Sequence, residues 1–337
     1  MTRPLKWCAT AVATFAAVIA IAITFTIGWR PFIGPRARPL TVRTFESTPQ
    51  RIERGRYIVT ALSGCLYCHS QHNWASPGTP IVAGTEGAGS IQPEAGLPGR
   101  IVAPNLTPDA ASGAGTWTDD QLARAIREGI GHDGRALFPM MPYEHYRYMS
   151  DEDLASVVVY LRTLPAVRND LPKTEIIFPV KYLIRSAPEP VTSAVNPDET
   201  SDPIKRGSRL ANLAGCVDCH TPMIRGQKVE GMDFAGGSIF EGPWGSVASA
   251  NLTPDATGIP YYDEALFREV LRTGFVRARA LNPIMPVMVY KNLSDQDLND
   301  IFAYLRSLKP VKHHVDNSEA ATQCKLCGQK HGAGAEN

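Results

Sequence analysis

The sequence has almost no excess charge of either sign, because 34 lysines and arginines face 33 aspartates and glutamates. A net charge of +1 leaves no broad basic surface for a nucleic-acid backbone, so we expect no nucleic-acid partner. The chain also lacks sustained alternation of apolar and polar residues, which argues against a large β-sheet. With 44% hydrophobic and 20% charged residues, the 337-residue chain has a globular composition and enough length for two domains.

Charged residues are missing altogether from one N-terminal stretch, residues 8–28. As a helix it would span roughly 30 Å, the thickness of a bilayer's hydrocarbon core. Trp7 and Trp29 flank the stretch at the positions of interfacial aromatic residues. The stretch also lacks a small-residue cleavage site at its end. We therefore predict a transmembrane anchor over residues 1–30, with a cleaved signal peptide as the alternative.

The seven cysteines are few and unevenly placed, and four of them form two Cys-x-x-Cys-His runs at residues 65–69 and 216–220. This pentapeptide is the attachment signature of haem c, in which two thiols bind the porphyrin and the adjacent histidine binds iron. A zinc site or a redox disulfide would not require that histidine twice. We therefore predict two covalently bound haem c groups. The predicted haem-binding residues are Cys65, Cys68, Cys216 and Cys219, and the predicted iron ligands from these runs are His69 and His220.

The rest of the chain is duplicated. Residues 105–109 and 251–255 both read Asn-Leu-Thr-Pro-Asp, and a Met-Pro pair recurs at Met141 and Met285. Nine residues after each methionine, Ser150 and Ser294 open a Ser-Asp-x-Asp-Leu run that leads into an apolar helix. Both serines are good N-caps. Repeated motifs in the same order indicate two homologous domains.

Apolar residues at helical spacing predict three main helices in each half and an all-α fold. The predicted helices are 51–64, 118–130 and 150–164 in the first half, and 203–214, 262–274 and 294–308 in the second. The predicted division is an anchor at 1–30, a juxtamembrane linker at 31–50, a first domain at 51–165, a proline-rich extended strap at 166–202, a second domain at 203–310 and a C-terminal tail at 311–337.

Each haem iron needs a sixth ligand from farther along the chain. A methionine there raises the reduction potential and closes the iron, which suits electron transfer. Met141 and Met285 are the predicted ligands, because they share the Met-Pro context and the register to the final helix. The other candidate donors within range are Met140, Met288, His132 and His145.

The C-terminal tail carries a third Cys-x-x-Cys pair, Cys324 and Cys327, with His313 before it and His331 after it. A third standard haem c site is rejected, because Gly328 stands where the histidine would be. A zinc site, a disulfide loop and the remnant of a lost haem site stay open, and the disulfide is favoured in an oxidising compartment.

The haem runs, the Asn-Leu-Thr-Pro-Asp segments and the Met-Pro motifs give residues 51–310 a resemblance to the class I cytochrome c superfamily. More closely, the chain resembles the multihaem cytochrome c subunits of membrane-bound alcohol and gluconate dehydrogenases. The resemblance implies two tandem all-α cytochrome c domains with His–Met haems, pairing His69 with Met141 and His220 with Met285. Those subunits usually carry three haems, whereas this chain has two complete runs.

These features predict an electron carrier without catalysis of its own, working between a quinol- or substrate-oxidising partner and a terminal acceptor. The expected partners are subunits of a membrane oxidoreductase complex, other cytochromes, a terminal oxidase or reaction centre, and membrane lipid. Since haem c is attached outside the membrane, we expect the haem domains on the periplasmic side of the bacterial inner membrane. Arginines after the apolar stretch favour the opposite orientation, but long domains translocate regardless of nearby charge. A dihaem peroxidase and a dihaem enzyme that oxidises sulfur compounds are the alternatives, and each needs an open or unusual iron ligand.

Overall fold

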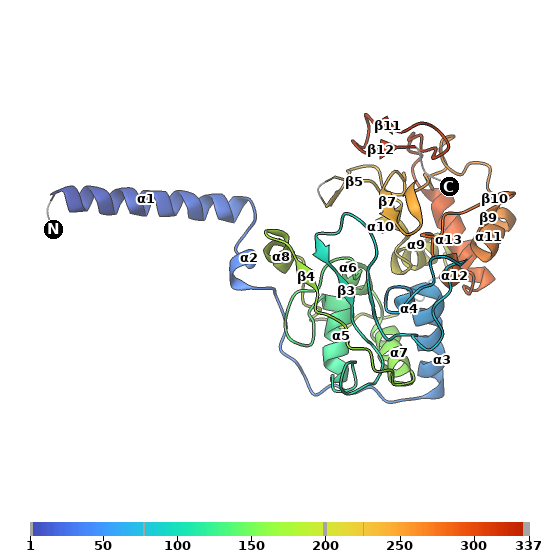
Figure 1. The fold of residues 1–337 in the computed structure, drawn as a ribbon, viewed down its shortest axis with the longest axis horizontal. Helices are drawn as coiled ribbons and strands as arrows, with labels where there is room; N and C mark the ends of the chain where they lie inside the picture. Colours follow the sequence, from blue (N-terminus) through green and yellow to red (C-terminus); the bar gives the residue numbers. More distant parts are fainter. Residues whose placement is uncertain (1–2, 77, 198–200, 225, 333–337) are drawn as a thin grey trace.

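The computed structural model describes residues 3–76, 78–197, 201–224 and 226–332. Helix α1 (Arg3–Phe25) projects as a single rod from a body that contains both halves of the chain (Figure 1). The helix is long and apolar enough to cross a membrane, by length and composition. It ends before the predicted boundary at residue 28, because the chain turns through Gly28 at a φ of +67°.

All six predicted helices are present, so this part of the fold prediction is confirmed. The main helices of the first half are α3 (Pro49–Tyr57) with its π-helical continuation η1 (Ile58–Leu62), α5 (Asp119–Glu128) and α7 (Asp151–Arg162). Those of the second half are α9 (Pro203–Leu213), α11 (Glu264–Thr273) and α13 (Asp295–Ser307). Ser150 and Ser294 cap the final helices as expected, with each hydroxyl accepting a hydrogen bond from the backbone N–H three residues on.

The first and last helices of each half pack against each other, α3 on α7 and α9 on α13 (Figure 1). A glycine lies at each contact. A Cβ on Gly55 would overlap the carbonyl oxygen of Ser156, and a Cβ on Gly207 would overlap that of Asp300. The two glycines therefore permit a backbone approach that any side chain would block. This explains why a glycine recurs in the first helix of both halves.

The all-α prediction is only partly right, because short antiparallel strand pairs stabilise the loops. They are β1 (Ser90–Ile91) with β3 (Val102–Ala103), β2 (Gly99–Arg100) with β4 (Glu175–Ile176), β5 (Met223–Ile224) with β6 (Gln227–Lys228), β7 (Ile239–Gly242) with β8 (Gly245–Ala248), β9 (Phe275–Val276) with β10 (Arg279–Ala280), and β11 (Thr322–Gln323) with β12 (Lys330–His331). Strands of two to four residues are too short to leave an alternating pattern in the sequence.

The predicted strap, residues 166–202, is only partly extended. It contains β4, then a helical turn, α8 (Val180–Leu183), and a short 3-10 turn, η2 (Ile184–Ser186). Both turns contact α2 (Arg30–Ile33), the short helix that follows the membrane helix, and Arg185 donates to the carbonyl of Pro31 at 3.0 Å. Residues 198–200 of the strap and 333–337 of the tail lie outside the described residues.

The two halves share one apolar core. Leu62 and Leu161 of the first half and Leu298 and Leu305 of the second belong to the same cluster of buried side chains. Tyr57 crosses between the halves, where its hydroxyl contacts the Asp297 carboxylate and accepts a hydrogen bond from the N–H of Ser294 at 3.0 Å. The duplicated units therefore pack as one body (Figure 1).

Candidate haem sites

Each Cys-x-x-Cys run forms a single helical turn, α4 (Cys65–Cys68) and α10 (Cys216–Cys219). A glycine in the left-handed region precedes each turn, Gly64 at a φ of +57° and Gly215 at +70°. The left-handed residue reverses the chain sharply after the first helix of its half. Each pair of thiols is thus presented by one rigid turn, with the histidine directly at its end.

The two histidines make the same hydrogen bond, although His69 is buried and His220 only partly so. The Nδ1 of His69 donates to the carbonyl of Pro104 and that of His220 to the carbonyl of Ala250, both at 2.7 Å. Neither Nε2 forms a hydrogen bond within the described residues. Desolvation lowers the pKa of both imidazoles, which favours the neutral form that binds metal. A carbonyl on one ring nitrogen and a free second nitrogen is the usual arrangement of a metal-binding histidine.

The carbonyls that hold the histidines immediately precede the two Asn-Leu-Thr-Pro-Asp segments. In each segment the asparagine side chain accepts hydrogen bonds from the threonine two residues on, both Asn105 to Thr107 and Asn251 to Thr253. The same amides donate to carbonyls that follow the final helices, at 2.7 Å for Asn105 and 2.9 Å for Asn251. The motif therefore fixes the histidine-supporting loop to the end of its domain.

The two methionines lie in matching turns. Pro142 and Pro286 follow them at φ,ψ of −82°, 50° and −78°, 57°, and lead into the short helices α6 (Tyr143–Tyr146) and α12 (Val287–Tyr290). Met141 and Met285 are both partly buried against the common core. The matching backbone conformation of the two turns is consistent with the same role for both methionines. The assignment of Met141 and Met285 as iron ligands stays a prediction.

A pair of tyrosines that sequence reasoning missed ties each methionine turn to its attachment turn. The hydroxyl of Tyr146 donates to the carbonyl of Ser63 at 3.0 Å, and that of Tyr290 donates to the carbonyl of Ala214 at 2.5 Å. Both acceptors lie directly before the glycine that opens the cysteine turn. The signal was available, because each tyrosine comes five residues after its methionine.

The alternative histidine donors have other contacts. His145 has an oxygen acceptor at each ring nitrogen, Oδ1 of Asn212 at 2.5 Å from Nδ1 and Oδ1 of Asp218 at 2.7 Å from Nε2. His132 is exposed and stacks on Trp117, with ring centroids 4.2 Å apart. Both ring nitrogens of His145 are therefore occupied, whereas His132 is set apart by its exposure and its stacking.

The two sites contact each other reciprocally. Tyr67, between the cysteines of the first run, donates to the carbonyl of Ile284, the residue before Met285, at 3.3 Å. Asp218, between the cysteines of the second run, pairs with His145, four residues after Met141. Each attachment turn thus lies against the methionine turn of the other half.

These residues fit one covalently bound haem in each half. Two thiols share a helical turn, an imidazole with one hydrogen-bonded and one free nitrogen follows, and a tyrosine bonds the methionine turn to the residue before the glycine of the same attachment turn. Together they define a c-type haem protein of the electron-carrying kind.

Comparison with known proteins agrees with this geometry. The family model described as cytochrome c matches residues 52–165 and 204–309, so the chain belongs to the cytochrome c family. The chain is 30% identical over 292 residues to the fructose dehydrogenase cytochrome subunit of Gluconobacter japonicus, covering 82% of this chain and 56% of that one. It is 29% identical over 275 residues to the gluconate 2-dehydrogenase cytochrome c subunit of Pantoea cypripedii, covering 76% and 59%.

A third relative, a diheme cytochrome c-type protein of Cereibacter sphaeroides, is 28% identical over 274 residues, covering 77% of this chain and 86% of that protein. The chain spans little more than half the length of the fructose and gluconate dehydrogenase subunits. The predicted resemblance to cytochrome c subunits of dehydrogenases is confirmed.

Proposed function

We propose that this chain is a membrane-anchored dihaem cytochrome c that relays electrons on the periplasmic side of the bacterial inner membrane. Its donor would be a quinol- or substrate-oxidising partner, and its acceptor another cytochrome, a terminal oxidase or a reaction centre. The names of its dehydrogenase-subunit relatives support a place in such a complex, with catalysis in a partner subunit.

The observation that carries the proposal is the reciprocal contact between the two sites. His69 and Met141 would hold one iron and His220 and Met285 the other, with thioether bonds from Cys65, Cys68, Cys216 and Cys219. Because each attachment turn touches the other half's methionine turn, the two haems would be neighbours. When bound, they supply one-electron chemistry at each iron. The protein's part is to hold both irons closed and close together, so that an electron entering one half can leave from the other.

We propose domain boundaries at 51–165 and 203–310, supported by the family matches at 52–165 and 204–309. The anchor would be residues 1–30, followed by a linker at 31–50, and the remaining segments are the strap at 166–202 and the tail at 311–337. Exposed apolar side chains near the exit of α1 support a membrane surface there, with Phe32 57% exposed on α2 and Phe178 77% exposed two residues before α8.

Four measurements test the proposal, two on the solubilised chain and two on membranes and their detergent extract. The intact mass should exceed that of the mature polypeptide by two haems, and the reduced protein should be low-spin and bind carbon monoxide poorly. The chain should stay with membranes through a high-salt wash and co-purify with an oxidoreductase after solubilisation. A high-spin haem that turns over peroxide would replace the relay by a peroxidase, and an N-terminus beyond Trp29 would replace the anchor by a signal peptide.

A further inference from the structure

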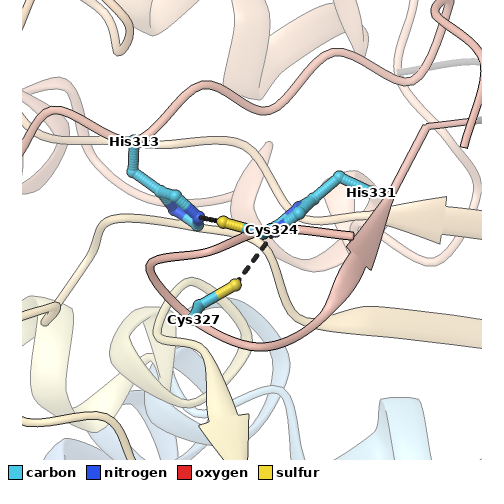
Figure 2. Close-up of side chains that lie close together, drawn as sticks. All are labelled: His313, Cys324, Cys327 and His331. Atoms are coloured by element: carbon cyan, nitrogen blue, oxygen red, sulfur yellow. Dashed lines mark hydrogen bonds between the residues drawn. The ribbon is translucent and has the colours of Figure 1, made fainter. Parts of the chain in front are cut away.

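Away from both haem sites, four potential metal ligands converge in the C-terminal tail. The ligand atoms of His313, Cys324, Cys327 and His331 all lie within 4.8 Å of one another. The Sγ of Cys324 is 3.3 Å from Nε2 of His313, and the Sγ of Cys327 is 3.0 Å from Nε2 of His331 (Figure 2). We propose that these residues form a structural Cys2His2 zinc site that fastens the tail to the second haem domain.

The distances suit one tetrahedral ion. Zinc–sulfur bonds of about 2.3 Å and zinc–nitrogen bonds of about 2.0 Å place neighbouring ligand atoms about 3.3 to 3.8 Å apart. All separations are at most 4.8 Å, so the widest would have to close by up to roughly 1 to 1.5 Å and the 3.0 Å contact of Cys327 with His331 would have to open by roughly 0.5 Å around such an ion. Two thiolates with two imidazoles in a tetrahedron are typical of zinc or of an iron–sulfur centre, and metal analysis distinguishes the two.

The local fold presents the ligands as a built site. The antiparallel pair β11–β12 brings Thr322 opposite His331, with the two cysteines in the turn between the strands. Gly328, at a φ of +69°, donates its N–H to the carbonyl of Cys324 at 3.1 Å and turns the chain back toward β12. The glycine that rules out a third haem is therefore the residue that closes this turn.

Groups around the ligands fix their orientation. The Nδ1 of His313 donates to the carbonyl of Ala235 at 2.8 Å, which leaves its Nε2 directed at the cluster. The N–H of Leu326 points at the Sγ of Cys324 at 3.4 Å, a contact that favours a thiolate. Gly237 admits the two rings, since a Cβ there would lie 2.6 Å from Cε1 of His313 and nearer still to Cε1 of His331.

Burial argues for a bound ion rather than two separate thiol–imidazole contacts. His313 is 1% exposed, Cys327 0% and His331 5%, and the Nδ1 of His331 has no hydrogen-bond partner among the described residues. Both cysteines are free thiols, each facing an imidazole. A disulfide between them would leave the two buried imidazoles without a ligand or a charge to bind.

The site would stabilise the second haem domain, because His313 is bonded to the loop that follows His220. Ala235 holds His313, and the next residue, Gly236, donates its N–H to the carbonyl of His220 at 2.7 Å. The expected role is therefore to stabilise this loop, with no part in electron transfer itself.

The test is elemental analysis of the full chain, with both haems, purified in detergent from zinc-supplied cells and without a polyhistidine tag. We expect one zinc and two irons per chain. Cys324→Ser together with Cys327→Ser should remove the zinc and leave two irons, with a lower Tm. Cys8→Ser and His314→Gln are the matched controls, because both side chains are exposed and outside the cluster, and they should keep the zinc.

Thiol alkylation of the denatured, unreduced wild-type chain gives a result that does not depend on any variant folding. With chelator present, three thiols should react, Cys8, Cys324 and Cys327, since the haem cysteines are consumed. One reactive thiol would mean a disulfide and would overturn the proposal. A third iron in place of zinc, a third haem mass, or zinc kept by the double serine variant would overturn it equally.

Discussion

In the first half of the chain, residues that precede the domain pack onto it and bind one of its helices. In the second half, residues that follow the domain pack onto it instead. Arg38 and Thr41, in the linker after the membrane helix, bind the buried carboxylate of Asp120 on α5. In the second half the corresponding position of α11 is the exposed Ala265, which offers no carboxylate, and the tail from His313 to His331 packs against the loop after the haem run instead. The duplicated frame, meaning the helices and haem runs that recur in both halves, is therefore the same in each half. The segments that pack onto it, the linker in the first half and the tail in the second, are different. The predictions below test which parts belong to the frame and which to one half.

The largest effect should come from the glycines of the frame. Gly55→Ala and Gly207→Ala each place a methyl group on a backbone carbonyl of the opposing helix, so we expect each to cost about 3 kcal/mol or more of unfolding free energy. The measurement is urea unfolding followed by circular dichroism in detergent. Lys205→Ala, on an exposed part of the same helix as Gly207, is the control and should change little. If the two substitutions lowered the unfolding free energy by clearly different amounts, the two helix–helix contacts would not be equivalent.

The next largest effect concerns the methionines. Met141→Ala or Met285→Ala should open one iron, abolish half of the thioether-to-iron absorbance and lower that haem's potential by on the order of 0.1 V, part of the roughly 0.8 V that axial ligands span. Redox titration with optical spectra measures both changes. Met140→Ala and Met288→Ala are the neighbouring controls and should leave the spectrum unchanged. A variant at Met141 or Met285 with the wild-type spectrum would contradict the ligand assignment.

The sequence predicted these features unequally, and the reason is physical. The cysteine runs, the serine caps and the helices are determined by neighbours within a few residues, so the pattern alone indicated them. Arg38 with Asp120, and Tyr67 with Ile284, join residues 82 and 217 apart along the chain, and no local spacing marks such pairs. The tail shows both cases. Its Cys-x-x-Cys pair was visible, but whether His313 and His331 reach the thiols depends on how the hairpin folds.

Removing the contact of the linker with Asp120 should have a smaller effect on the free energy of unfolding, and this effect should depend on pH. Desolvation raises the pKa of Asp120, but hydrogen bonds from Arg38 and Thr41 outweigh it and lower the pKa to about 2. A lowered carboxyl pKa stabilises the fold above the ordinary value near 4, and that stability is lost as pH falls toward 2. Asp120→Asn should therefore cost about 2 kcal/mol at neutral pH.

The pH profile of that variant distinguishes its cause. The difference from wild type in urea unfolding should stay constant from pH 7 to 5 and shrink between pH 4 and 2. Glu264→Gln, in the first turn of the matching helix α11, is the control and should cost little, since its pair with Arg268 is exposed and 3.9 Å long. A cost for Asp120→Asn that grows toward low pH would contradict the ion-pair explanation.

The smallest effect should come from the contact between the halves at His145. Desolvation lowers the pKa of this imidazole and Lys228 lowers it further, but the hydrogen bond and charge of Asp218, with a contribution from Asn212, leave the pKa raised overall. A raised histidine pKa stabilises the fold fully below the ordinary value near 6.5, and that stability is lost as pH rises through the folded-state value. His145→Gln keeps a polar side chain but removes the charge, so it should cost about 1 kcal/mol at pH 6 and progressively less above pH 7. Urea unfolding of wild type and variant at matched pH values measures the difference.

Tyr67→Phe breaks the reciprocal contact without a titrating group, so its cost should be independent of pH over the same range. If the cost of His145→Gln increases with pH, the pair with Asp218 is not what holds the two haem sites together on that side.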